Sequence, residues 1–269
     1  MKRNEFIKKI SFASLLMADG KILPAFTENI IQKNSQMRFL VASDGHFGQA
    51  KTDFVNYYET FVSQANQQHL HSKLDFCVIN GDIIHDDPQF MPQAKQILDK
   101  LSVPYFVTQG NHDHLTEEDW KKVWNVPLNY SFEKGENAFL FGTTSNEKGE
   151  YLSPNVAWFS EQLEHFSTKK NIFIFVHITP VKWTSNGVDA VEFQNLLKKY
   201  TNIRAVFNGH DHDQEGIKQK DGISYIFDSH FGGNWGTNYR GFRIVELNRD
   251  NSILTYLLNP FTKVNENKL

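Results

Sequence analysis

The sequence has a single cysteine, no long hydrophobic run and almost no excess of charge, and each absence excludes a class of protein. Cys77 has no second cysteine with which to form an internal disulfide, and its place in the apolar run LDFCVI indicates a buried thiol rather than a nucleophile. No run reaches the length of about 18 apolar residues that a membrane-spanning helix needs. The 28 basic and 31 acidic residues nearly cancel, which argues against a nucleic-acid polymer or a membrane surface as the main partner.

The length and the hydrophobic content are sufficient for one large domain. The chain has 269 residues, 40% of them hydrophobic, and the 23 phenylalanines supply ample material for a core. No linker, repeat or low-complexity segment divides the chain. We therefore expect a single domain over residues 37–262, preceded by a leader over 1–36 and followed by a tail over 263–269.

The leader has the outline of an export signal. Lys2, Arg3, Lys8 and Lys9 precede a short apolar stretch, and RNEFIK resembles a twin-arginine motif with Asn4 in the place of the second arginine. A clear small-residue cleavage site is missing, and an amphipathic helix on a cytoplasmic protein is the alternative. We favour export to the periplasm or another extracytoplasmic compartment.

Apolar runs that alternate with helix-like segments predict an α/β fold. Most runs are continuously apolar, as expected for strands covered on both faces. The expected strands cover 37–43, 75–80, 104–109, 138–143, 171–177 and 203–209, and the expected helices cover 52–70, 91–101, 116–124, 154–166 and 188–200. Three further runs, 222–228, 241–247 and 252–258, follow one another without a helix, and we expect an antiparallel set that completes a second sheet.

Imidazole, carboxylate and amide side chains follow the ends of five expected strands. Because the carboxyl ends of strands in an open α/β sheet meet at one crevice, we expect these side chains to share one site. Mixed imidazole and carboxylate ligands suit Mn, Fe, Zn or Co, and the groups are too many for one tetrahedral ion but enough for two. Asp82 stands alone on the central strand and is the best candidate to bridge two ions. The side chains are Asp44, His46, Asp82, Asn111, His112, Asp113, His177, His210 and His212.

In this order the residues resemble the signature of the calcineurin-like metallophosphoesterase superfamily. That signature reads D-x-H, GD, GNH[D/E], H and GH-x-H, and every element is present between residues 44 and 212. Each block follows an apolar strand, so the context agrees with the motif. The resemblance implies a four-layer α/β/β/α sandwich of two mixed sheets flanked by helices, with a site for two metal ions (Mn, Fe or Zn).

The resemblance also implies roles for the individual residues. The expected activity is hydrolysis of phosphate esters, by in-line attack of a hydroxide that both ions share. His112 would protonate the leaving oxygen or stabilise the developing charge, and Asp113 would fix the tautomer of that imidazole. The first metal would be held by Asp44, His46, Asp82 and His212, and the second by Asp82, Asn111, His177 and His210.

Other histidines have plainer interpretations. His114 follows the GNHD block, where the metal positions are already filled, and we expect it to be a loop or rim residue. His230 lies in DSHFGG, which imitates SDGHFG, and we interpret it as a mimic or a pocket-wall residue. The remaining candidates for solvated surface positions are His69, His71 and His165.

The segment GDIIHDDP separates this chain from two branches of the superfamily. Purple acid phosphatases place a metal-binding tyrosine three residues after the bridging aspartate, where this chain has His85. Protein Ser/Thr phosphatases continue as GDxVDRG, which does not match. The chain is similar to small stand-alone phosphoesterases such as the class III cyclic-nucleotide phosphodiesterases. His85, Asp86 and Asp87 are expected to form a solvated turn, with a position on the substrate side as the alternative.

The sequence contains few substrate signals. Trp183, Trp235, Tyr239 and Arg240 lie on expected rim loops, where they could equally stack on a base or anchor the loops. The motif blocks contain few lysines or arginines, which favours a phosphodiester over a phosphomonoester dianion. A phosphomonoesterase and a non-catalytic metal-binding protein of the same fold are the alternatives, and the oligomeric state is not indicated.

Overall fold

The fold is described from a computed structural model that defines residues 35–259 and 262–269. The expected leader over 1–36 therefore lies almost wholly outside the described residues, and the export interpretation stays a prediction. Within the described ranges no helix combines the length and the hydrophobicity needed to cross a membrane.

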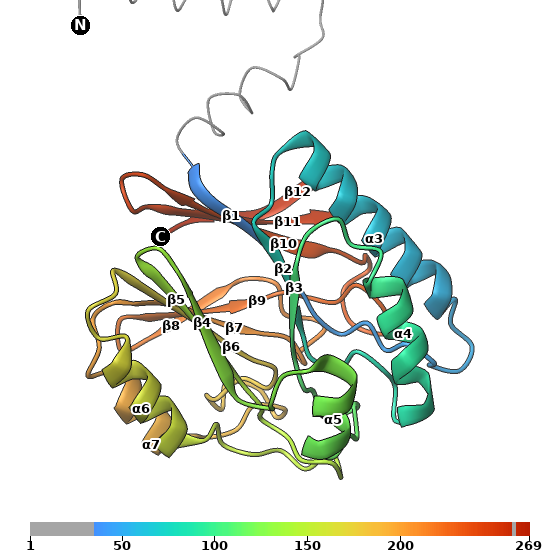
Figure 1. The fold of residues 1–269 in the computed structure, drawn as a ribbon, viewed down its shortest axis with the longest axis horizontal. Helices are drawn as coiled ribbons and strands as arrows, with labels where there is room; N and C mark the ends of the chain where they lie inside the picture. Colours follow the sequence, from blue (N-terminus) through green and yellow to red (C-terminus); the bar gives the residue numbers. More distant parts are fainter. Residues whose placement is uncertain (1–34, 260–261) are drawn as a thin grey trace, which may run out of the picture.

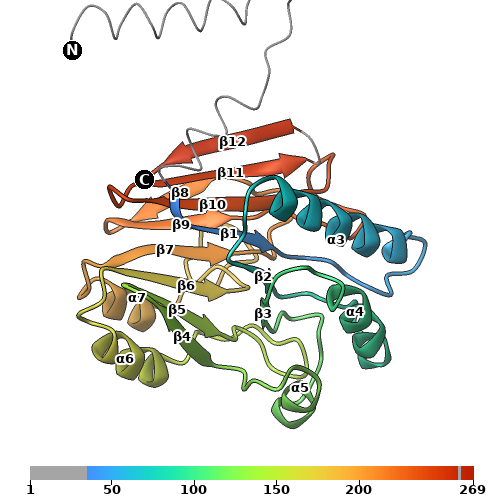
Figure 2. The same ribbon diagram turned by 45° about the horizontal axis from the view of Figure 1, so that its top comes forward.

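Two facing sheets form the centre of the described part of the chain, each with six strands (Figures 1 and 2). The first sheet has the order β12-β11-β10-β1-β2-β3, and the second has the order β4-β5-β6-β7-β9-β8. The strands of the first are β1 Ser35–Ala42, β2 Phe76–Asn80, β3 Tyr105–Thr108, β10 Phe242–Asn248, β11 Ile253–Asn259 and β12 Thr262–Lys268. Those of the second are β4 Tyr130–Lys134, β5 Asn137–Gly142, β6 Asn171–Val176, β7 Ile203–Asn208, β8 Ile217–Lys220 and β9 Ile223–Phe227.

Helices cover the outer face of each sheet. On the first sheet lie α3 Phe54–His71, the short 3-10 helix η1 Pro88–Phe90, α4 Met91–Leu98 and α5 Glu117–Trp124. On the second lie α6 Val156–His165 and α7 Val191–Leu197. The predicted four-layer α/β/β/α sandwich of two mixed sheets is confirmed.

A layer of phenylalanine rings joins the two sheets. Along β1 the side chains alternate, so that Phe39 faces the second sheet while Leu40 faces the helices of its own sheet. The Phe39 ring is stacked on Phe76 at 4.9 Å and meets Phe139 edge-on at 5.9 Å. Both faces of the central strands are therefore buried, which explains their continuous apolar sequence.

Truncation of the inter-sheet layer should weaken the fold strongly. We expect Phe39→Ala to lower the free energy of unfolding by about 3–5 kcal/mol, because a fully buried ring is lost and a cavity is left between the sheets. Urea denaturation of the purified chain measures this. Leu70→Ala is the matched control, because that side chain is 84% exposed and should cost less than about 0.5 kcal/mol. Equal losses in the two variants would contradict the assignment of this layer as core.

The last third of the chain departs from the expected antiparallel set. β9 is parallel to β7 in the second sheet, whereas β10 and β11 extend the first sheet next to β1. The prediction that residues 222–228 pair with the two later runs is therefore wrong. Between β9 and β10 the chain crosses from one sheet to the other, and on the way the Phe231 N–H donates to the Ser43 carbonyl at 3.1 Å. β12 then continues the first sheet to Lys268, within the residues that we expected to form a tail.

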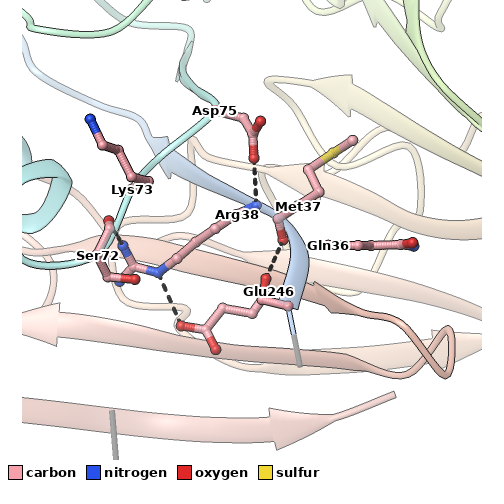
Figure 3. A pocket seen from close by; sticks show the side chains of 8 residues that line it. Gln36, Met37, Arg38, Ser72, Lys73, Asp75 and Glu246 are labelled. Atoms are coloured by element: carbon pink, nitrogen blue, oxygen red, sulfur yellow. Dashed lines mark hydrogen bonds and ion pairs between the residues drawn. The ribbon is translucent and has the colours of Figure 1, made fainter. Parts of the chain in front are cut away.

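A buried ion pair ties β1 to β10 near the amino end of β1 (Figure 3). Arg38 Nε lies 3.0 Å from Glu246 Oε1, and Arg38 Nη1 donates to the Ser72 carbonyl at 2.7 Å. These residues line a cavity of about 310 Å³ together with Asp75, which accepts the backbone N–H of Arg38. The predicted metal ligands follow the opposite end of β1, so this cavity is separate from them.

Candidate metal centre

Parallel strands of both sheets direct their carboxyl ends to one edge of the sandwich. There the side chains that follow the first sheet meet those that follow the second, as the 3.8 Å distance between Asp44 Oδ1 and His177 Nε2 shows. Six of the seven predicted ligands fall into two compact groups. The first group is Asp44, His46 and His212, and the second is Asp82, His177 and His210.

The first group combines one carboxylate and two imidazoles, all buried. His212 Nε2 lies 3.1 Å from Asp44 Oδ1 and 3.0 Å from His46 Nε2. His46 Nε2 also lies 3.8 Å from Asp44 Oδ1. The three ligand atoms thus lie close enough together to be held by one transition-metal ion.

The second group is arranged in the same way around His177. Its Nε2 lies 3.1 Å from Asp82 Oδ2, and its Nδ1 bonds to the Asn80 carbonyl at 2.7 Å. That backbone bond fixes the tautomer and leaves Nε2 for a ligand. The oxygen Asp82 Oδ2 is also 3.7 Å from His46 Nε2 in the first group, so this carboxylate lies between the two groups.

Two buried atoms of the centre have neither a hydrogen bond nor an ion pair. They are Asn111 Oδ1 and His210 Nε2, two of the atoms that a second metal ion would engage under the sequence prediction. Buried polar atoms are rarely left unpaired in folded proteins, because each costs about 1–3 kcal/mol. The donor set therefore fits a bound metal ion, which would satisfy both atoms.

The backbone is strained at the same positions. Four of the predicted ligands have a positive φ, which residues other than glycine seldom adopt. The values are +60° at Asp44, +47° at His46, +50° at Asp82 and +65° at His210. Gly110 has to be glycine because a Cβ there would overlap Asp82. Strain of this kind persists only where the surrounding structure enforces it, and it is concentrated at functional sites.

The ionisation of the centre follows from burial and from the mixture of charges. Burial alone would raise the pKa of Asp44, but His212 and His177 outweigh it and lower that pKa below its usual value. Burial lowers the pKa of His177, yet Asp82 and Asp44 outweigh it and raise the value to about 10. Burial lowers the pKa of His210 to about 4. A cation that binds here meets ionised carboxylates and a neutral His210, and it has to displace a proton from His177.

His112 is oriented by Asp86, and the prediction that Asp113 does so is wrong. His112 Nδ1 lies 2.6 Å from Asp86 Oδ1, and His114 Nε2 lies 3.3 Å from the same oxygen. Burial lowers the pKa of His112, but Asp82 and Asp86 outweigh it and the pKa is raised. Asp86 is exposed, as a turn residue would be, yet it holds the imidazole that the sequence marks as the acid.

Asp113 instead holds the backbone of the GNHD segment. Its Oδ1 accepts the N–H of Ile84 at 3.0 Å and its Oδ2 accepts the N–H of Gly110 at 2.7 Å. Burial and the nearby Asp82 raise the pKa of this carboxyl group to about 7. The chain turns at Asn111 and His112, and the Asp113 carboxylate is fully buried against the backbone while the His112 side chain is 28% exposed.

His85 was also missed as a site residue. Its side chain is 24% exposed, and its Nδ1 lies 3.1 Å from His46 Nδ1. The signal that could have found both His85 and Asp86 is their position within four residues of Asp82, because a loop that short stays beside the aspartate. The expected solvated turn describes the exposed Asp86, but it does not describe the half-buried His85, and both residues contact histidines of the site.

The other histidines lie outside the two groups. His114 Nδ1 bonds to the Glu147 carbonyl at 3.0 Å, on the loop beside Asp86. His230 stacks on His212 with ring centroids 4.9 Å apart, so it packs against a predicted ligand. The residues in the last turns of helices α3 and α6 are His69, His71 and His165.

Among the aromatic residues expected on rim loops, Trp235 contacts predicted ligands. Its ring lies 4.1 Å from that of His212 at an interplanar angle of 12°, and 38% of the residue is exposed. Trp183 packs against the core of the second sheet, and Arg240 stacks on a tyrosine of α3, so both anchor loops. Sequence reasoning missed Tyr151, which is 43% exposed and meets the His210 ring edge-on at 4.9 Å.

Two bacterial proteins are similar to this chain in sequence. The chain is 23% identical over 187 residues to a probable cyclic nucleotide phosphodiesterase of Psychrobacter arcticus, an alignment that covers 62% of this chain and 66% of that protein. It is 27% identical over 194 residues to the probable glycerophosphodiester phosphodiesterase GpdQ of Arcobacter nitrofigilis, covering 64% of this chain and 68% of that protein. The alignments thus span about two thirds of the length of these relatives.

A solved structure has a similar fold, and a family model matches the part of the chain that contains the site. A dimetal phosphatase from Danio rerio superposes with a TM-score of 0.69 at 12% identity, covering 87% of this chain and 99% of that one. The family model for calcineurin-like phosphoesterase matches residues 37–214, the segment that holds every strand-end ligand described above. The chain belongs to the calcineurin-like phosphoesterase family.

Proposed function

We propose that this protein hydrolyses phosphate esters with two metal ions and prefers phosphodiesters. The observation that carries the proposal is the pair of histidine–carboxylate groups that share Asp82 and contain buried ligand atoms without partners. The names of the two bacterial relatives support the same class of substrate.

The proposed ligand sets follow the two groups. Mixed imidazole, carboxylate and amide ligands fit Mn, Fe or Zn. When bound, such a pair of ions supplies an activated nucleophile and neutralises charge on the phosphoryl group. The first ion would be held by Asp44, His46, Asp82 and His212, and the second by Asp82, Asn111, His177 and His210.

The residues of the chain provide the proton. His112 Nδ1 is engaged by Asp86, so Nε2 is the nitrogen that can give a proton to the leaving oxygen. Burial lowers the pKa of His112, but Asp82 and Asp86 outweigh it and raise the pKa, which favours the protonated imidazole that an acid requires. The backbone N–H of His112 donates to Asp82 Oδ1 at 2.9 Å, which keeps the acid beside the proposed bridging ligand.

The charges around the site support a diester substrate. Within the described residues, the ion pairs of Asp44, Asp82 and Asp86 are all with histidines and none is with lysine or arginine. A phosphodiester carries one negative charge, which two metal ions can neutralise without further cations. A phosphomonoester dianion requires more positive charge than these side chains offer.

A panel of esters tests the proposal. The metal-depleted chain is reconstituted with Mn or Fe and assayed on bis-p-nitrophenyl phosphate, p-nitrophenyl phosphate, and linear and cyclic nucleotide diesters. We expect faster turnover of the diesters than of the monoester. Faster turnover of the monoester would instead support a phosphomonoesterase of the same fold. Two bound ions without turnover of any ester would support a non-catalytic metal-binding protein.

Removing the carboxylate that orients the acid should slow turnover without releasing metal. We expect Asp86→Asn to lower kcat by about 10–100-fold, because the His112 imidazole loses its charged partner. Asp86 also helps to raise the pKa of His112, so the decline of activity with rising pH should begin at lower pH in the variant. A pH–rate profile and elemental analysis measure both effects. Asp87→Asn is the neighbouring control and should keep wild-type kcat, and an unchanged kcat in Asp86→Asn would refute this role.

A further inference from the structure

The metal-facing imidazoles differ in what supports their second nitrogen. His177 Nδ1 donates to the Asn80 carbonyl at 2.7 Å, and His212 Nδ1 donates to the Trp235 carbonyl at 3.2 Å. His46 Nδ1 instead meets a side chain, His85, whose Nδ1 lies 3.1 Å away. One predicted ligand of the first ion thus depends on a group that a substitution can remove.

The direction of the hydrogen bond follows from the position of His46. Its Nε2 lies 3.0 Å from His212 Nε2 and 3.7 Å from Asp82 Oδ2, so this nitrogen belongs to the first group. A metal ion at Nε2 requires that nitrogen to be deprotonated, which places the proton of a neutral imidazole on Nδ1. His46 Nδ1–H is therefore the donor, and His85 Nδ1 is the acceptor.

The backbone holds the two imidazoles side by side. The segments after β1 and β2 form a short parallel ladder in which the His46 N–H donates to the Asp82 carbonyl at 3.0 Å. One step further, the His85 N–H donates to the Phe47 carbonyl at 2.9 Å. The contact between the rings is thus built into the loops that carry the first and the bridging carboxylates.

We propose that His85 is a positioning residue for the first metal ion, because it accepts the Nδ1–H of His46 and fixes the orientation of that ligand. The inference rests on the proposed two-metal site. Partners of this kind keep a ligating imidazole in one tautomer and raise its basicity, and their loss costs about 10–100-fold in metal affinity. His85 also stacks on His112 at 4.9 Å and 14°, so it contacts both the metal ligand and the proposed acid.

A third cation site is the competing interpretation of the same residues. His46, His85 and His112 offer ligand atoms within 4.8 Å of one another, a nitrogen set that zinc or copper would favour. His46 could join that site through Nδ1 only as a doubly metallated imidazolate, because its Nε2 faces the first group. The hydrogen bond requires no such deprotonation, and it is the interpretation that we test.

Metal titration of the full chain tests the proposal without any assay of turnover. The metal-depleted wild type and variants are titrated with Mn²⁺ by calorimetry, and Co²⁺ absorption reports the geometry of the bound ion. We expect His85→Ala to weaken one of the two binding steps by about 10–100-fold and to leave the other unchanged. His85→Asn should recover most of the loss, because its Oδ1 can accept in place of the imidazole Nδ1.

A double-mutant cycle assigns the effect to the contact with His46. In a His46→Ala background, His85→Ala should cause no further loss of Mn²⁺ affinity, since the donor has gone. His114→Ala is the control on the same rim and should keep wild-type affinity for both ions. Thermal unfolding of each variant verifies that it is folded, and His85→Leu, which fills the space but has no acceptor atom, carries the test if His85→Ala does not fold.

Three results would overturn the proposal. They are unchanged affinity in His85→Ala, an equal loss in His85→Asn and His85→Ala, and a third bound equivalent in the wild type that His85→Asn loses. The outcome is independent of the proposed function. A wild type that binds two ions but hydrolyses no ester would refute the function and leave the role of His85 intact.

Discussion

Alanine at position 82 should empty the metal centre and reduce ester hydrolysis by at least about 10³-fold. Asp82 Oδ2 is the oxygen between the two groups, 3.1 Å from His177 Nε2 and 3.7 Å from His46 Nε2. Its loss takes a ligand from both ions at once. It also leaves the buried His177 without the carboxylate that contributes most to its raised pKa. Elemental analysis of the purified chain and turnover of bis-p-nitrophenyl phosphate measure the two effects.

Two further variants separate the loss of metal from a loss of fold. Asp82→Asn keeps the shape of the side chain, and its Oδ1 can still accept the His112 N–H that the wild type bonds at 2.9 Å. We expect this variant to fold, to bind less metal and to remain inactive. Asp213→Ala changes an exposed carboxylate that directly follows His212 in the sequence, and this variant should behave as wild type. Full activity and full metal content in Asp82→Ala would refute the proposed centre.

Removal of the acid should have the opposite signature, with loss of turnover while both ions stay bound. We expect His112→Ala to lower kcat by about 10²–10⁴-fold on esters with a poor leaving group, because the departing oxygen is no longer protonated. The loss should be much smaller with p-nitrophenyl esters, since nitrophenolate leaves without a proton. A series of diesters with leaving groups of graded basicity measures the difference.

The neighbouring histidine supplies the control for this experiment. His114→Ala removes a side chain that also contacts Asp86, at 3.3 Å, but that carries no proposed chemistry. It should change kcat by less than tenfold on every substrate. Metal loss in His112→Ala would show that this imidazole is a ligand. An equal loss across the leaving-group series would show that it does not act as an acid.

The strands that sequence patterns predicted well are those with both faces buried. β1, β2, β5, β6 and β7 are covered by helices on one face and by the phenylalanine layer on the other, so their sequences are continuously apolar. The missed strands β4, β8 and β12 all lie at sheet edges. Edge strands carry charged residues that discourage further pairing, and IKQK and TKVNENK consequently have no strand pattern.

What the sequence could not predict about the site also has a physical reason. Motif order located the residues that converge, because strand ends fix where each block begins. It could not give the direction of a side chain within a block, which depends on φ and ψ at single residues. Asp113 is adjacent to His112 in sequence, but its carboxylate accepts the backbone N–H groups of Gly110 and Ile84. The imidazole of His112 instead bonds to Asp86, whose own φ is +66°.

The way in which the ligands are divided between the sheets has a mechanical consequence. Under the proposed assignment each ion is held by residues that follow β1, β2 or β3 and also by residues that follow β6 or β7. The ions would therefore cross-link the two sheets at one edge of the sandwich, whereas the phenylalanine layer holds the sheets together in the interior. Any shift of one sheet relative to the other would change the distance between the two ions. The packing of the phenylalanine layer, far from the edge, would thus help to fix that distance.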